Sequence, residues 1–234
     1  MANYPTTTYL IEDKQIGTEQ LVFRGCQFVS VLSAFYLTTE FVTGNMENIV
    51  LPDFLMSLLQ CFLGMSILYV PSLVKKVAKI NMPDALCSFF YVFVVCGTVL
   101  GEAFSLYYVI PLWDSILHFG SGIMSGMLGG ILLVTFLQKE HCEKLITPVV
   151  VVTSIICFAM CIGVLWEIFE FAADSLLGVN MQKWMLQDGT ELIGRSALLD
   201  TMKDLVVDLT GATVAAITAC SSLKQKKGWL INSN

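Results

Sequence analysis

Apolar residues in this chain come in runs of about 20, separated by short polar or basic segments. An α-helix needs a run of about this length to cross the hydrocarbon core of a bilayer. Six such runs can be read: Leu21–Val42, Val50–Leu73, Ala85–Ile110, Leu112–Leu137, Pro148–Phe171 and Thr201–Leu223. The pattern predicts an all-α fold, a polytopic membrane helix bundle of about six transmembrane helices.

The composition agrees with a membrane protein, since 56% of the residues are hydrophobic and only 14% are charged. The first 20 residues are polar and no small-residue cleavage site follows the first apolar run, so we expect no removable signal peptide. We expect a cytoplasmic N-terminal segment at 1–20, one transmembrane domain at 21–223 and a cytoplasmic tail at 224–234. Within the domain, three generic spans precede a core at 112–223 that carries the motifs.

Basic residues predict the orientation of the chain. With six spans, ten of the 13 lysines and arginines fall on one side of the membrane: Lys14, Arg24, Lys75, Lys76, Lys79, Lys139, Lys144, Lys224, Lys226 and Lys227. Positive loops stay cytoplasmic, which predicts a multi-pass protein of the cell (plasma or inner) membrane with both termini inside. The net charge of −6 argues against a nucleic-acid partner. None of the eight cysteines falls in an outer loop, so we expect no structural disulfides.

Acidic residues converge on the outer half of the last three spans. The stretch "GVLWEIFEFAADSLLG" carries three carboxylates at spacings of three and four, which places them on one helix face. Two other spans carry acids or histidine at spacings of four. The candidates are Glu167, Glu170 and Asp174 on the fifth span, Asp200, Asp204 and Asp208 on the sixth, and Asp114 and His118 on the fourth.

Several carboxylates at this depth must protonate, pair with a base or bind a cation. Because bases are few, the surplus of acid predicts a divalent metal site, with His118 as its nitrogen ligand. The candidate ligands are Asp114, His118, Glu167, Glu170, Asp204 and Asp208. A structural alternative is that Asp200, Thr201 and Asp204 start a helix as a capping box, although capping does not explain Asp208 or Glu167.

Small residues and one long loop complete the predicted site. Gly122, Gly126 and Gly130 recur every four residues, and with Gly211 they predict close helix packing. In the loop from Ser175 to Leu199, the residues around Trp184 suit a short helix lying in the membrane interface. Weaker candidates for binding a ligand flank this loop or lie in it: Asp174, Asp200, Lys183 and Arg195. Of these, Lys183 and Arg195 are the ones that could meet an anionic head group.

The order "WDSILHFGSG", "WEIFEFAAD" and "LLDTMKDLVVDLTGA", from Trp113 to Ala215, resembles the YjdF-type family of bacterial inner-membrane proteins. More distantly it is similar to the VanZ-like proteins, whose pattern corresponds here to Asp114, His118, Glu167, Glu170, Asp204, Asp208 and Gly211. The wider resemblance implies a role in the bacterial envelope, linked to low-level teicoplanin resistance. The chain departs from the VanZ-like pattern at Glu170, where a glutamine is common, and this weakens the transfer of that role.

Four functions stay open at this point. The first is a membrane protein whose outward-facing acidic pocket binds a divalent cation and a lipid-linked or anionic envelope ligand. The second is a metal-dependent membrane hydrolase with Glu167 or Glu170 as the catalytic base. The third is a proton or cation transporter, against which stand the lack of an internal repeat and the alanines that follow Asp208. The fourth is a non-catalytic accessory protein, whose protein partners the sequence does not identify.

Overall fold

The computed structural model describes residues 17–44, 51–186, 188–225 and 228–230 of the 234. Within these ranges the chain is helical apart from its turns and one isolated bridge between Met185 and Glu191. Six helical segments of the described chain are long and apolar enough to cross a membrane. The prediction of an all-α bundle with about six spans is therefore confirmed.

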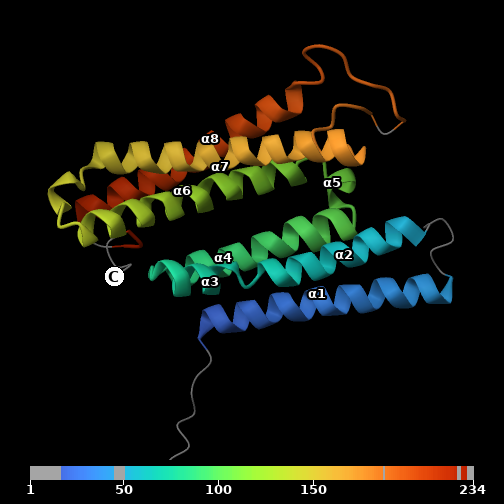
Figure 1. Cartoon of the computed structure of the whole chain (residues 1–234), viewed down its shortest axis with the longest axis horizontal. Coiled ribbons are helices and arrows are strands. Elements are labelled where there is room, and N and C mark those ends of the chain that lie inside the picture. Colours follow the sequence, from blue (N-terminus) through green and yellow to red (C-terminus); the bar gives the residue numbers. More distant parts are fainter. Residues whose placement is uncertain (1–16, 45–50, 187, 226–227, 231–234) are drawn as a thin grey trace, which may run out of the picture.

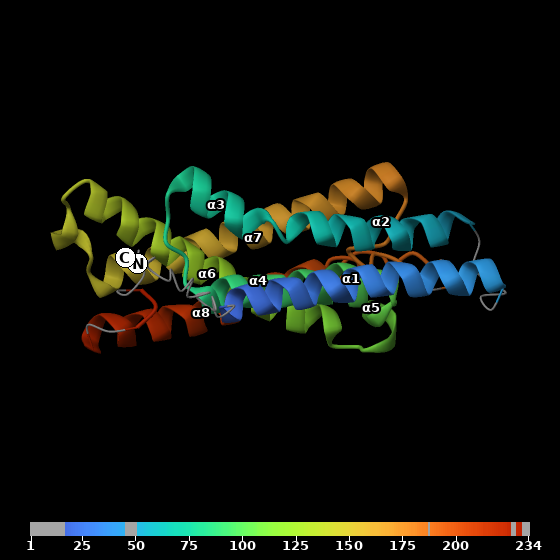
Figure 2. The ribbon, with the colours of Figure 1, turned by 90° about the horizontal axis from the view of Figure 1, so that it is seen from below.

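The helices form two groups of three antiparallel spans (Figure 1). The first group contains α1 (Thr18–Thr43), α2 (Leu51–Ile67) with α3 (Val70–Ala78), and α4 (Asp84–Val94) with the π-helix η1 (Val95–Ala103). The second contains α6 (Trp113–Lys139), α7 (Pro148–Leu177) and α8 (Leu199–Gln225). Contacts are densest within each group, and mainly α4, η1 and the short helix α5 (Leu106–Val109) join the first group to α6. Figure 2 shows the same spans from below, lying along a common axis.

The two ends of the bundle differ. The start of α1 and the end of α8 lie at one end, called here the termini end, and the long 178–198 segment lies at the other, called the loop end (Figure 1). At the termini end Lys75 Nζ donates to both carboxylate oxygens of Glu19, at 2.9 and 2.8 Å. The Tyr91 hydroxyl donates to the same Glu19 carboxylate at 3.0 Å. This polar cluster joins α1, α3 and α4.

Two predicted spans are interrupted, each for a local reason. The second span breaks between Ile67 and Val70, because Pro71 has no N–H to donate and its ring clashes with the carbonyl four residues earlier. The third does not run on to Ile110, because η1 ends at Ala103 and Ser105 adopts a left-handed conformation with φ 58°. The chain also breaks at Pro111, which lies between α5 and α6.

Near the loop end, one predicted boundary falls short and one predicted element is wrong. Helix α7 continues beyond Phe171 to Leu177, and Gly178, with φ 68°, closes it. The segment around Trp184 is a small hairpin and not an interfacial helix, since Leu192 N donates to the Trp184 carbonyl and Leu186 N to the Thr190 carbonyl. Its turn forms at Asp188 and Gly189, where the Asp188 carboxylate accepts from Thr190 N. That hydrogen bond lowers the pKa of Asp188 below its usual value.

Candidate functional site

Helices α6 and α8 approach so closely that side chains do not fit between their backbones. A Cβ on Gly122 would collide with the carbonyl oxygen of Asp208, and one on Gly211 with the carbonyl oxygen of Phe119. Farther along, a Cβ on Gly126 would lie 3.2 Å from the Ala215 Cβ. Small residues permit this approach, which brings the acidic faces of α6 and α8 together near the loop end.

His118 lies at the centre of the polar residues and is only 5% exposed. Its Nδ1 is 3.1 Å from Asp208 Oδ2. In the tautomer that carries its proton on Nδ1, the imidazole donates this bond to Asp208 and leaves Nε2 with a free lone pair. The other ring nitrogen, Nε2, faces Asp114 Oδ1 at 3.8 Å and Glu167 Oε1 at 4.0 Å. Asp208 therefore fixes the ring so that Nε2 is directed at the carboxylates of Asp114 and Glu167.

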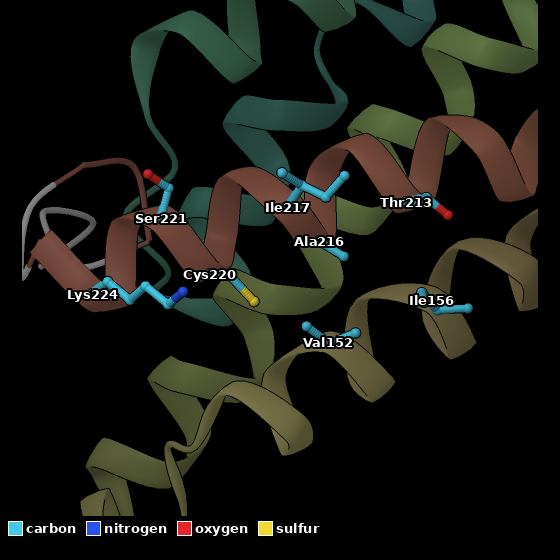
Figure 3. A pocket seen from close by; sticks show the side chains of 8 residues that line it. All are labelled: Val152, Ile156, Thr213, Ala216, Ile217, Cys220, Ser221 and Lys224. Atoms are coloured by element: carbon cyan, nitrogen blue, oxygen red, sulfur yellow. The ribbon is translucent and has the colours of Figure 1, made fainter.

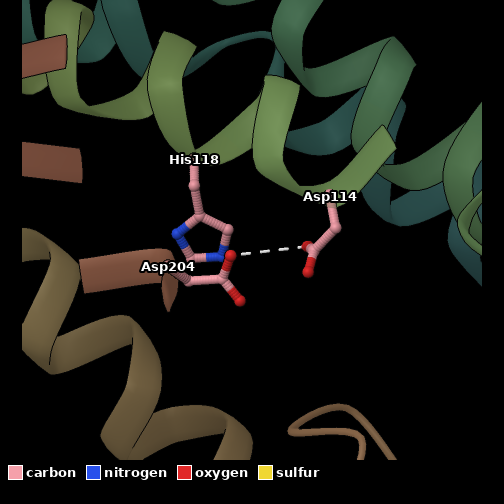
Figure 4. Close-up of side chains that lie close together, drawn as sticks. All are labelled: Asp114, His118 and Asp204. Atoms are coloured by element: carbon pink, nitrogen blue, oxygen red, sulfur yellow. Dashed lines mark ion pairs between the residues drawn. The ribbon is translucent and has the colours of Figure 1, made fainter. Parts of the chain in front are cut away.

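Three of these residues offer ligand atoms within 4.8 Å of one another: Asp114, His118 and Asp204 (Figure 4). Asp204 is 1% exposed and its Oδ1 has no hydrogen-bond partner among the described residues. Both carboxylate oxygens of Glu167, which is 5% exposed, are also without one. Oxygens that have lost water and gained no donor are costly, and a cation held among them would offset that cost.

One cation of the protein itself reaches this cluster. Lys183 Nζ contacts Asp114 Oδ2 and lies 3.1 Å from both carboxylate oxygens of Asp200. Burial favours a lower pKa for Lys183, but the charges and hydrogen bonds of the two aspartates outweigh it and raise the pKa above its ordinary value. Lys183 also has a left-handed backbone conformation, with φ 49°, which non-glycine residues rarely adopt. Lys183 thus neutralises part of the acidic cluster from the loop.

The start of the loop is fastened to the helices by hydrogen bonds. Both carboxylate oxygens of Asp174 accept from the backbone, from Met181 N at 2.7 Å and Gln182 N at 3.0 Å. Gln182 Nε2 in turn donates to Thr201 Oγ1 at 2.9 Å. Asp174 therefore anchors the loop, and its predicted role in binding a ligand gains no support from this geometry. Thr201 lies inside α8 and not at its N-cap, so the predicted capping box is wrong.

Among the described residues, no hydrogen bond or ion pair joins the remaining predicted residues to His118 Nε2. Glu170 is buried on α7, where its Oε1 accepts from Trp166 Nε1 at 2.8 Å. Arg195 is exposed, and no hydrogen bond or ion pair joins it to the cluster within the described ranges. Of the predicted packing residues, Gly130 contacts Ile155, where a Cβ would lie 3.1 Å from Cγ1.

Two residues that contribute to the site, Gly163 and Gln182, were not among the candidates. A Cβ on Gly163 would lie 2.6 Å from Asp208 Oδ2, so this glycine makes room for the carboxylate that orients His118. Its position four residues before Glu167, on the same helix face, was an available signal. Gln182 had none, because its partner Thr201 lies 19 positions away.

Comparison with known proteins identifies the family of this chain but finds no similar solved structure. The model of a family described as "Predicted membrane protein (DUF2238)" matches residues 29–225. An uncharacterized protein of Thermotoga maritima is 29% identical over 150 residues, which cover 63% of this chain and 68% of that protein. No solved structure matches the chain. With most of its length matched, including all six spans in whole or in part, the chain belongs to the DUF2238 family of predicted membrane proteins.

Proposed function

We propose that this protein binds a divalent metal cation between α6, α7 and α8, with Asp114, His118, Glu167 and Asp204 as ligands. One observation carries the proposal. The buried Nε2 of His118 faces carboxylates while its Nδ1 is held by Asp208. Histidines that bind metals almost always have this second partner, which fixes the ring and raises its basicity. In this arrangement Asp208 is a positioning residue and not a ligand.

Charge supports the same conclusion. Lys183 pairs with Asp114 and Asp200, which leaves Glu167, Asp204 and Asp208 to share His118 as their nearest base. Even a protonated imidazole would balance only one of three carboxylates. A divalent cation supplies the missing positive charge and gives a partner to the oxygens of Glu167 and Asp204 that have no hydrogen bond within the described residues.

The donor set favours a transition metal over Ca²⁺ or Mg²⁺. Ca²⁺ takes six to eight oxygen ligands, and Mg²⁺ prefers to keep most of its waters. One imidazole nitrogen with two or three carboxylates suits Mn²⁺ or Zn²⁺ better. A metal held in this way would bind an anionic group at any open position, with Lys183 beside it.

We place the site on the outer side of the cell membrane. Most basic residues lie at the termini end, which the distribution of positive charge assigns to the cytoplasm. The family match agrees with the YjdF-type resemblance, whereas the likeness to VanZ-like proteins, and the envelope role that it implies, rest on the motif alone.

Transport through the site is less favoured. Beyond Asp208 the next buried residues of α8 are glycine and alanine, and they pack tightly. Ala212 and Ala215 are 0% exposed, and Ala216 is 4% exposed. They continue into an apolar cluster with Val151 and Ile155. A conduction path would need polar groups there.

The proposal is tested by thermal unfolding of the detergent-purified protein in EDTA and in Mg²⁺, Ca²⁺, Mn²⁺ or Zn²⁺. A cation at about 100 times its dissociation constant adds about 2.7 kcal/mol of stability. We expect Mn²⁺ or Zn²⁺ to raise the midpoint in wild type and not in Asp204→Asn. The control is Asp188→Asn, which changes a loop acid and should respond like wild type. A wild-type protein indifferent to all four cations would refute the metal site.

A further inference from the structure

A second site lies between α7 and α8, in the half of the bundle toward the termini end. It is a groove of about 440 Å³ with apolar walls and a lysine at one end (Figure 3). Its lining residues are Val152, Ile156, Thr213, Ala216, Ile217, Cys220, Ser221 and Lys224. It is separate from the His118 cluster and does not depend on the metal site proposed above, but it rests on the orientation proposed there, with the termini end in the cytoplasm.

We propose that this groove binds one anionic phospholipid, with an acyl chain along the groove and the phosphate on Lys224. Basic pockets between membrane helices at the cytoplasmic side are a recurring site for anionic lipid head groups. Here the basic group is part of the groove lining itself, and two further lysines follow it in the sequence.

The dimensions of the groove fit one acyl chain. The lining residues of α8 extend from Thr213 to Lys224, which is about 16 Å at about 1.5 Å per residue. One leaflet contributes about half of a hydrocarbon core of about 30 Å. The groove thus reaches from near the bilayer centre to the level of the head groups, as a chain attached to a phosphate at Lys224 requires.

The shape and charge of the lining also favour a lipid. The small Ala216 side chain, 4% exposed, lies at the base of the groove, whereas Ile217 beside it is 64% exposed. Val152 and Ile156 of α7 face α8 across it (Figure 3). Lys224 is exposed, and within the described residues no acidic side chain forms an ion pair with it. An apolar groove that ends in an ammonium with no acidic partner among the described residues is complementary to an acyl chain ending in a phosphodiester.

The experiment is native mass spectrometry of the delipidated protein with phosphatidylglycerol or with phosphatidylcholine of the same acyl chains. We expect one phosphatidylglycerol to be retained severalfold more than phosphatidylcholine. Lys224→Gln should reduce the retention of phosphatidylglycerol to that of phosphatidylcholine, whereas Lys224→Arg should preserve the preference for phosphatidylglycerol. The matched control is Lys139→Gln, a lysine in the last turn of α6 at the same end but outside the groove.

Filling the groove separates site binding from general lipid adhesion. Cys220→Phe places a ring in the groove and should reduce retention of both lipids, whereas Cys157→Phe, an exposed cysteine of α7 outside the lining, should not. Equal retention of the two lipids by wild type, or a preference that survives Lys224→Gln, would overturn the proposal. So would unchanged binding in Cys220→Phe, or occupancy of the groove by a co-purified protein that added lipid does not displace.

Discussion

At the scale of single residues, Asp204 and Asp208 lie one helical turn apart on α8 but have different relations to His118. Asp208 bonds to Nδ1, whereas Asp204 shares the acidic cluster with Asp114 (Figure 4). The proposed site therefore assigns one aspartate to the metal and the other to the orientation of its histidine ligand. The two roles predict different consequences of the same chemical change.

Asp208→Asn keeps an oxygen at the histidine but removes the charge that favours a proton on Nδ1. We expect the affinity for Mn²⁺ or Zn²⁺ to fall about 10- to 100-fold, the usual cost of losing a second partner of a metal-bound histidine. Asp204→Asn, which removes a ligand, should cost more. Calorimetric titration measures the metal affinity of both variants. A larger loss in Asp208→Asn than in Asp204→Asn would mean that Asp208 is the ligand and Asp204 the positioning residue.

Lys183 competes with a metal for Asp114, because its ammonium already contacts Oδ2 of that carboxylate. Lys183→Met should therefore raise the metal affinity about tenfold, equivalent to about 1.4 kcal/mol. Arg195→Met, which removes an exposed charge of the same loop, should leave the affinity near that of wild type. If Lys183→Met lowered the affinity, the lysine would be helping to assemble the cluster and not competing with the metal.

The pH dependence of metal binding should arise from the ligands alone. The pKa of Lys183 is raised in the folded protein by its ion pairs with Asp114 and Asp200. These pairs therefore stabilise the fold fully below the unfolded-state pKa of about 10.4. Their contribution is lost only as the pH rises through the folded-state pKa. Lys183 thus stays charged from about pH 6 to pH 9. Because metal ligands must lose their protons, affinity should rise with pH across this window, equally in Lys183→Met. A slope that disappears in that variant would contradict this assignment.

At the scale of helices, the contact of α6 with α8 sets the geometry of the site. Gly122→Ala should destabilise the protein by about 1–3 kcal/mol, because the new methyl group meets the Asp208 backbone and not a movable side chain. Gly25→Ala, in α1 with open space around it, should be neutral or stabilise by up to about 1 kcal/mol. Unfolding midpoints in detergent measure both, and equal effects would show that the close approach of α6 to α8 is not needed.

Spans could be predicted from the sequence because hydrocarbon thickness imposes a length on every apolar run. Their interruptions were harder. Pro71 was a local signal for the break between α2 and α3, but nothing local marks the π-helix η1, whose Cys96 carbonyl accepts from Trp113 Nε1 at 3.2 Å. The helix predicted around Trp184 failed because main-chain hydrogen bonds of a hairpin outweighed the amphipathic pattern.

The candidate site was predictable only in part for a similar reason. Regular spacing within α6, α7 and α8 places acids on one face of each helix, so the convergence of Asp114, His118, Glu167, Asp204 and Asp208 follows from three periodicities and antiparallel packing. Which aspartate holds the histidine depends on side-chain directions between helices. The Lys183 pairs with Asp114 and Asp200 join residues 69 and 17 positions apart, which no local pattern specifies.

At the scale of the whole molecule, the even number of spans places the start of α1 and the end of α8 together (Figure 1). A reporter active only in the cytoplasm should work when fused at the C-terminus and fail when inserted at the Asp188–Gly189 turn, in a bacterial host. A reporter active only outside should give the opposite result. Reversed outcomes would put the acidic site on the cytoplasmic side and contradict the envelope role.

The central claim is that one metal binds among Asp114, His118, Glu167 and Asp204, and equilibrium dialysis against Mn²⁺ or Zn²⁺ tests it most directly. Wild type should bind one ion per chain, and Glu167→Gln, which removes a charge from a buried carboxylate without a hydrogen-bond partner among the described residues, should weaken that binding by at least about tenfold. Glu191→Gln, a substitution of a loop acid, should bind like wild type. Wild-type binding no greater than that of Glu167→Gln would mean that these carboxylates hold protons and not a metal.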